Sequence, residues 1–110
     1  IHTTELDTIY ARGVELLQKR KYAKALYILN DYNDRNTVVA HLSLDHNERA
    51  MELLATMPKD AVTEYLRAIA CSRLGRKAEG REHFLEACRL DGRMEYRGNL
   101  DPEIAELLKQ

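Results

Sequence analysis

The stretch "YLRAIACSRLGRKAEGREHFLEACRLD", from Tyr65 to Asp91, decides the fold because it has the pattern of two helices joined by one turn. Gly75 lies at its centre, where a helix end favours a residue that tolerates left-handed backbone geometry. On both sides of Gly75, small and apolar residues recur at spacings of three and four, which is the helical period. The same stretch contains both cysteines and His83, so it raises a question of chemistry as well as of architecture.

The second half of this pattern occurs three times along the chain. The segments "KYAKALYIL", "HNERAMELL" and "RKAEGREHF" each place a small residue four positions before a large apolar one. The pairs are Ala25 and Leu29, Ala50 and Leu54, and Gly80 and Phe84. The small residues lie 25 and then 30 positions apart. A helix pair that recurs at this interval indicates a solenoid, because one pair cannot bury its apolar face alone.

Helix signals cover most of the remaining sequence, and strand signals are weak. The predicted helices cover residues 3–20, 21–29, 36–44, 45–57, 61–74, 76–90 and 101–109. Asp45, Asp60 and Asp101 are predicted N-caps, and Glu48 would complete a capping box with Asp45. Residues 94–99 are expected to form a connector with about one helical turn.

The opening stretch resembles a tetratricopeptide repeat. The matching positions are the small residues Ala68, Gly80 and Ala87, the turn residue Gly75 and the aromatic Phe84. In the first helix pair, Gly13, Tyr22, Ala25 and Leu29 match comparably, whereas the middle pair is shorter than the family's repeat. The resemblance implies an all-α, right-handed solenoid of about three antiparallel helical hairpins with a C-terminal capping helix. We expect residues 1–110 to be one helical-repeat domain and a fragment of a longer protein.

The ending "RGNLDPEI", residues 97–104, carries a second resemblance. It is similar to the C-terminal repeat segment of uncharacterised Bacteroidetes cell-envelope proteins. That resemblance favours the periplasm or the cell envelope of a Gram-negative bacterium over the cytoplasm, and it implies no activity.

Composition limits the classes of partner. Charged residues make up 32% of the chain and the formal net charge is −1, so the chain has no long-range attraction for nucleic acid or an anionic membrane. No apolar run approaches the ~20 residues of a membrane-spanning helix. The sequence also lacks a glycine-rich phosphate loop, and we expect no cofactor.

The cysteines and histidines offer little chemistry at these spacings. A disulfide between Cys71 and Cys88 would join positions offset by about one helical turn within a hairpin, which is too far for the bond. Both thiols are therefore expected to be small packing residues, although a thiol-dependent enzyme that uses Cys71 or Cys88 stays open. His41 and His46 are five positions apart, which does not place two ligands on one helix face, so we expect no metal site.

The resemblance implies that the first helix of each pair lines a concave groove that binds a peptide, a helix or another domain of the same chain. The candidate groove residues are Tyr10, Val14, Gln18, Arg35, Val39, Tyr65, Ile69, Ser72 and Arg73. An alternative is that Tyr65 and Ile69 simply pack in the core. The sequence thus predicts a non-enzymatic protein interaction or assembly scaffold. The alternatives are a purely structural docking segment of a larger envelope protein and, less favoured, the thiol enzyme.

Overall fold

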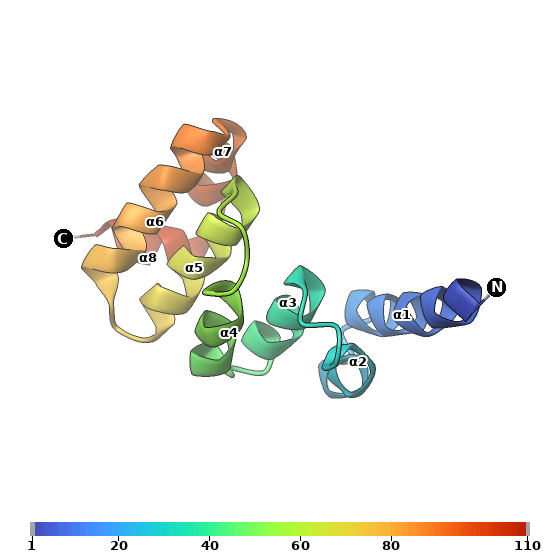
Figure 1. Cartoon of the computed structure of the whole chain (residues 1–110). Coiled ribbons are helices and arrows are strands. Elements are labelled where there is room, and N and C mark those ends of the chain that lie inside the picture. The colour runs from blue at the N-terminus through green and yellow to red at the C-terminus, as the bar shows by residue number, and fades with distance from the viewer. Residues whose placement is uncertain (1, 110) are drawn as a thin grey trace. The chain divides into compact units, whose positions relative to one another are not determined.

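A computed structural model describes the backbone of residues 2–109 and the side chains of residues 8–109. Over this range the chain forms eight α-helices and no strand, as Figure 1 shows, so the prediction of an all-α fold is confirmed. The helices are α1 (His2–Gln18), α2 (Tyr22–Leu29), α3 (Arg35–Ser43), α4 (Asn47–Leu54), α5 (Ala61–Arg73), α6 (Lys77–Leu90), α7 (Arg93–Asn99) and α8 (Pro102–Leu108). The expected connector at residues 94–99 is a full helix, α7.

The chain divides into two compact units. Unit 1 comprises residues 1–53 and contains α1, α2, α3 and most of α4. Unit 2 comprises residues 54–110 and contains α5 to α8. Each unit has its own internal packing and is described by itself.

Unit 1 is built around the hairpin of α1 and α2. Its core consists of Leu16, Ala25 and Leu29, all of which are buried. Gly13 lets the two helices approach closely, because a Cβ atom at this position would lie only 2.8 Å from Cδ2 of Leu29. The third helix, α3, packs mainly on α2.

Unit 2 repeats this plan with the hairpin of α5 and α6, which α7 and α8 cover. Its buried core consists of Tyr65, Ala68, Ile69, Phe84, Ala87, Met94, Ile104 and Leu107. Gly80 lies where α6 meets α5, since a Cβ atom there would be 3.2 Å from Cβ of Cys71. Gly98 lies directly against the Phe84 ring, where a Cβ atom would come within 2.5 Å of the ring carbons.

Three turns between consecutive helices share one backbone conformation. Arg20, Asp45 and Gly75 each adopt a left-handed backbone, with φ of 61°, 60° and 77°. These residues lie 25 and 30 positions apart, the same intervals as the small residues Ala25, Ala50 and Gly80 in the second helix of each pair. The left-handed residue ends each first helix in the manner expected of a glycine.

The backbone hydrogen bonds of these turns also coincide. After each left-handed residue, the next N–H donates to the carbonyl five positions earlier, which is the bond of a Schellman motif. The donor and acceptor pairs are Lys21 and Leu16 at 2.9 Å, His46 and His41 at 2.8 Å, and Arg76 and Cys71 at 2.8 Å. The repeat found in the sequence is therefore also a repeat of backbone geometry. Stacking of the hairpins into a solenoid stays a prediction.

A tyrosine on the first helix of each unit holds the start of the helix that covers the hairpin. In unit 1 the Tyr10 hydroxyl donates to Oδ2 of Asp34, the N-cap of α3. In unit 2 the Tyr65 hydroxyl donates to Oδ2 of Asp101 at 2.7 Å, and Asp101 is the N-cap of α8. Tyr10 and Tyr65 are 55 positions apart, as are Arg20 and Gly75.

The predicted N-caps divide into correct and incorrect ones. Asp60 caps α5 through a capping box with Thr63, and Asp101 caps α8 ahead of Pro102, as predicted. The prediction for Asp45 is wrong, because Asp45 occupies the left-handed position of the turn and α4 begins two residues later at Asn47. Aspartate suits both positions, since it tolerates left-handed geometry better than most residues.

Candidate functional site

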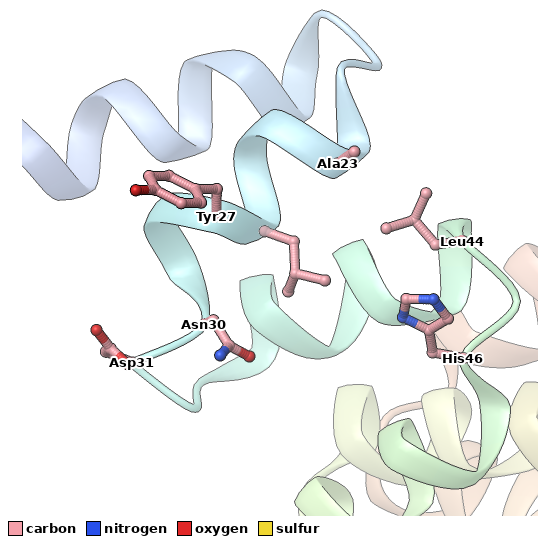
Figure 2. Close-up of a pocket in the computed structure, with 7 residues that line it drawn as sticks. Ala23, Tyr27, Asn30, Asp31, Leu44 and His46 are labelled. Atoms are coloured by element: carbon pink, nitrogen blue, oxygen red, sulfur yellow. The ribbon is translucent and has the colours of Figure 1, made fainter.

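The candidate site is a hollow on unit 1 that we call the Tyr27 hollow. It has a volume of about 500 Å³ and lies beside α2 and the turn that follows α3. Its lining residues are Ala23, Leu26, Tyr27, Asn30, Asp31, Leu44 and His46. Figure 2 shows Tyr27 on α2, with Leu44 and His46 coming from the α3–α4 turn.

The helical period explains why α2 contributes to this hollow. Ala25 and Leu29 are buried in the core of unit 1 and Ile28 packs against it, whereas Ala23 and Tyr27 on the other side of the helix are exposed. Tyr27 is 90% exposed, an unusual state for an aromatic side chain. Leu26 is half-buried beside it. The result is an apolar surface on the side of α2 away from its core residues.

The rim of the Tyr27 hollow is polar. Asn30 and Asp31 lie at the C-terminal end of α2, and His46 lies just before α4. An apolar floor with a few polar groups at its edge is the usual composition of a site that binds a peptide or a small molecule.

None of the nine predicted groove residues lines the Tyr27 hollow. Tyr65 and Ile69 are 1% and 6% exposed and belong to the core of unit 2, so the alternative that they pack internally holds for both. The apolar spacing of α5 predicted their place on one face of the helix. The predicted capping helix, α8, contacts α5 and α6, and the burial of Tyr65 and Ile69 removes both residues from the candidate groove.

The other groove candidates in unit 1 are dispersed. Tyr10 is half-buried, accepts a hydrogen bond from Asn36 at 2.7 Å and packs edge-on against Tyr32 with ring centroids 4.8 Å apart. Burial raises the pKa of Tyr10, and the hydrogen bond to Asp34 raises it further. The remaining candidates, Val14, Gln18, Arg35 and Val39, are half-buried or exposed.

Two further candidates lie in unit 2. Ser72 is half-buried. Arg73 is committed to an ion pair, because its Nε donates to Oε1 of Glu103 at 2.7 Å and links α5 to α8. Of the unit 2 candidates, only these two retain exposure to solvent.

The two cysteines are free thiols. Cys71 is fully buried, and burial, followed by the nearby charge of Glu79, raises its pKa to about 11. Burial also raises the pKa of Cys88, with a further contribution from Glu95. A nucleophilic cysteine needs a lowered pKa, so these surroundings favour the packing role for both side chains.

Sequence reasoning missed a buried polar cluster in unit 2, which we call the Glu64 network and which consists of Glu64, Arg67 and His83. Glu64 is only 1% exposed. Its Oε2 lies 2.6 Å from Nδ1 of His83, and its Oε1 accepts from Nη1 of Arg67. Arg67 in turn donates through Nη2 to the carbonyls of Leu54 and Met57.

The Glu64 network is explained by the cost of burying charge. An isolated buried carboxylate is strongly unfavourable, and partners on both oxygens remove that cost. The spacing of the sequence indicates that Glu64 is buried, because Glu64 precedes Ala68 by four and Cys71 by seven positions. These residues lie on the face of α5 that meets α6. His83 and Glu64 also border a polar hollow of about 410 Å³ with Lys59, Arg67, Glu82 and Glu86.

His41 and His46 meet although they are five positions apart. Their Nδ1 atoms lie 3.1 Å apart because the left-handed turn at Asp45 brings His46 back over the end of α3. The prediction that a spacing of five positions keeps these two side chains apart is therefore wrong. Within the part of the chain whose side chains are described, no group of three or more His, Cys, Asp or Glu residues is arranged to hold a metal ion.

A scan against protein-family models, a search of curated proteins and a search of solved structures each found no match to this chain. Among residues 2–109, none of the helices combines the length and the apolar character that crossing a bilayer requires.

Proposed function

We propose that this chain is a non-enzymatic interaction module of tetratricopeptide-like helical hairpins that binds a peptide, a helix or a neighbouring domain. Its support is the repeated architecture of the hairpins. Three turns share one backbone conformation at Arg20, Asp45 and Gly75, and repeated helical hairpins are a common scaffold for binding extended partners.

The Tyr27 hollow is the observation that carries this proposal. A tyrosine that is 90% exposed stands beside an apolar floor formed in part by Leu26 and Leu44. Tyrosine is enriched among the residues that contribute most to binding at protein interfaces, because its ring buries a large area at a small entropic cost. We therefore place the docking site on this face of α2, away from the predicted groove.

The partner's chemistry follows from the lining of the hollow. Its apolar floor suits an aliphatic or aromatic side chain of the partner, which would pack against Leu26 and the Tyr27 ring. At the rim, the Asn30 amide can donate hydrogen bonds to the partner's backbone carbonyls, and the Asn30 oxygen and the Asp31 carboxylate can accept from its N–H groups. Such a pattern is typical of peptide or helix recognition.

The proposal is tested by peptide selection on the intact chain. A phage-displayed peptide library is selected against the immobilised protein, and the affinity of the recovered peptides is measured by calorimetry for the wild type and for Tyr27→Ala. We expect peptides with a bulky apolar residue and at least a tenfold loss of affinity in Tyr27→Ala, as for a central aromatic contact residue.

Tyr96→Ala is the matched control, because Tyr96 is 72% exposed on α7 of unit 2. Both substitutions remove an exposed ring, so neither is expected to change the unfolding midpoint appreciably. The proposal is contradicted if no peptide is recovered, or if the two variants lose affinity equally.

A further inference from the structure

Unit 2 contains a second hollow, which we call the cationic hollow. It has a volume of about 600 Å³ and is lined by Lys77, Arg81, Glu106 and Lys109. Three of these four residues are cations at neutral pH, so the formal charges leave an excess of two positive charges in one small volume. The whole chain has a net charge of −1, which makes this local excess a distinct feature of the surface.

The cationic hollow shares one related lining position with the Tyr27 hollow of unit 1. The hairpins of the two units are related by a shift of 55 positions, which relates Arg20 to Gly75 in the turn and Leu29 to Phe84 in the core. The same shift relates Leu26 to Arg81, and each of them lines the hollow of its own unit.

Each hollow is also lined by the residue that ends a covering helix. Leu44 is the C-cap of α3 and lines the Tyr27 hollow, and Lys109 is the C-cap of α8 and lines the cationic hollow. The two linings differ in character, because the Tyr27 hollow contains Leu26 and Leu44 and the cationic hollow contains Arg81 and Lys109.

The cations are held in place by their surroundings. Nη1 of Arg81 donates to the carbonyl of Leu107 at 3.4 Å, at the C-terminal end of α8. Lys109 forms an ion pair with Glu106 at 3.1 Å. The hydrogen bond and charge of Lys109, with a smaller contribution from Lys77, lower the pKa of Glu106, which keeps this carboxylate ionised beside the cations.

We propose that the cationic hollow binds a carboxylate-rich segment of a peptide partner, in parallel with the apolar contact at the Tyr27 hollow. This inference rests on the proposed function. It gives the peptide partner carboxylates in addition to the apolar side chain that binds in the Tyr27 hollow. Arginine and lysine form their strongest surface contacts with carboxylates and phosphates.

The test measures binding of a fluorescein-labelled, end-blocked hexaglutamate peptide to the intact chain by fluorescence anisotropy in low salt. Arg81→Leu gives unit 2 the residue that unit 1 has at the related position. We expect this change to weaken hexaglutamate binding about fivefold or more, because it removes a charge-assisted contact. Binding should also weaken as salt is added, and hexaglutamine should not bind.

Controls separate the hollow from the general charge of the surface. Arg12→Leu removes an exposed cation that pairs with Glu15 three positions away, and it should leave hexaglutamate binding unchanged. Lys109→Gln removes a cation at the C-terminal end of α8, where no core packing depends on it, and it should weaken binding even if Arg81→Leu perturbs folding.

Several results would overturn the inference. The inference fails if hexaglutamate does not bind or if Arg12→Leu weakens binding as much as Arg81→Leu. It also fails if a single-stranded oligonucleotide or inorganic phosphate binds more tightly through Arg81. Tyr27→Ala should not affect hexaglutamate binding. A failure at the cationic hollow is therefore distinguishable from a failure at the Tyr27 hollow.

Discussion

At the scale of single residues, His41 stands out as a titratable group buried without full hydrogen bonding. It is 6% exposed, and its Nε2 atom has no hydrogen-bond partner among the described residues. Burial lowers the pKa of His41, and the positive charges of His46 and Arg49 lower it further. The neutral imidazole is therefore the form that the folded chain favours.

The lowered pKa of His41 makes stability depend on pH. The unfolded chain takes up a proton at this position near its ordinary pKa of 6.5, before the folded chain does. The stability that the neutral His41 contributes to the fold is therefore fully present above about pH 6.5. It is lost as the pH falls from there through the lower pKa of the folded state. We expect the urea midpoint of the wild type to fall between pH 7.5 and 5.

His41→Leu should remove this part of the pH dependence. Leucine is the residue at the related position of the first hairpin, Leu16, so the change keeps an apolar side chain at the end of the first helix. Urea unfolding of both proteins at several pH values checks the prediction. Parallel pH profiles for wild type and variant would show that His41 does not titrate on unfolding.

The residue scale also shows where sequence reasoning was sufficient. Asp60 and Asp101 were identified as N-caps because an apolar helical pattern follows each of them directly. The sequence did not predict the pairing of Glu64 with His83, because this pairing depends on how α5 crosses α6. A contact between two helices is set by tertiary packing, and no local pattern contains it.

At the scale of elements, three different residues adopt the same left-handed conformation at the three turns. Gly75 adopts its φ of 77° without a steric penalty, whereas Arg20 and Asp45 carry a side chain at a similar φ. A left-handed residue other than glycine costs roughly 1–2 kcal/mol, somewhat less for aspartate. The packing of each hairpin offsets this cost at Arg20 and Asp45.

Substitutions at the turns should therefore change stability in opposite directions. Gly75→Ala should destabilise the chain by about 1–2 kcal/mol, because a Cβ atom strains the backbone at this φ although nothing lies within 4 Å of it. Arg20→Gly should stabilise by about 0.5–1 kcal/mol, after the greater freedom of glycine in the unfolded chain is subtracted. Both values come from denaturant unfolding.

Gly92→Ala is the control for these changes. Gly92 has a φ of −57°, and a Cβ atom there also meets nothing within 4 Å. The substitution should therefore be neutral or slightly stabilising. Equal effects of Gly75→Ala and Gly92→Ala would mean that the left-handed conformation is not what glycine supplies at the turn.

Element positions were largely predictable, because period and caps are local properties. The helices around Gly75 and after Asp101 lie where the pattern predicted them. The sequence also predicted the short helix α3 in spite of its β-branched residues. It did not predict the equivalence of the turn at Asp45 with that at Gly75, because an aspartate before a helix is the usual signature of an N-cap.

At the scale of the whole molecule, the hairpin of unit 2 depends on a further helix for a complete core. In unit 2 this helix is α8, whose Ile104 and Leu107 are fully buried. Its N-cap Asp101 accepts the hydrogen bond from Tyr65. The Tyr65 ring also lies beneath the Arg97 guanidinium, 4.5 Å from the ring centroid, so α7 and α8 meet on the same aromatic side chain.

Deletion of residues 101–110 should therefore destabilise unit 2. Two fully buried aliphatic side chains contribute about 1.5–3 kcal/mol each, so the expected loss is about 3–6 kcal/mol. Calorimetry should show a lower and broader unfolding transition, and binding of a hydrophobic dye should increase. Leu108→Ala is the control, because Leu108 is 42% exposed and its truncation should cost little. A sharp transition at an unchanged temperature would contradict this role of α8.

The global arrangement was the least predictable part. The sequence predicted an all-α chain, and the described residues form helices and no strand, whereas the stacking of repeated hairpins stays a prediction. The candidate groove was inferred from how repeats stack in the resembling family. The Tyr27 hollow depends instead on which face of α2 its own unit leaves uncovered. That face is decided by the close approach of Gly13 to Leu29, which fixes the rotation of α2 on α1.

The Glu64 network has a consequence for how this sequence can change over generations. Loss of Arg67 alone removes the cation paired with Oε1 of the buried Glu64, and loss of His83 alone leaves Oε2 without its partner. Breaking a buried pair costs several kcal/mol, about 3–5. Replacement of all three by apolar side chains of similar volume avoids that cost. Positions 64, 67 and 83 should therefore covary among descendants of this chain, changing together or not at all.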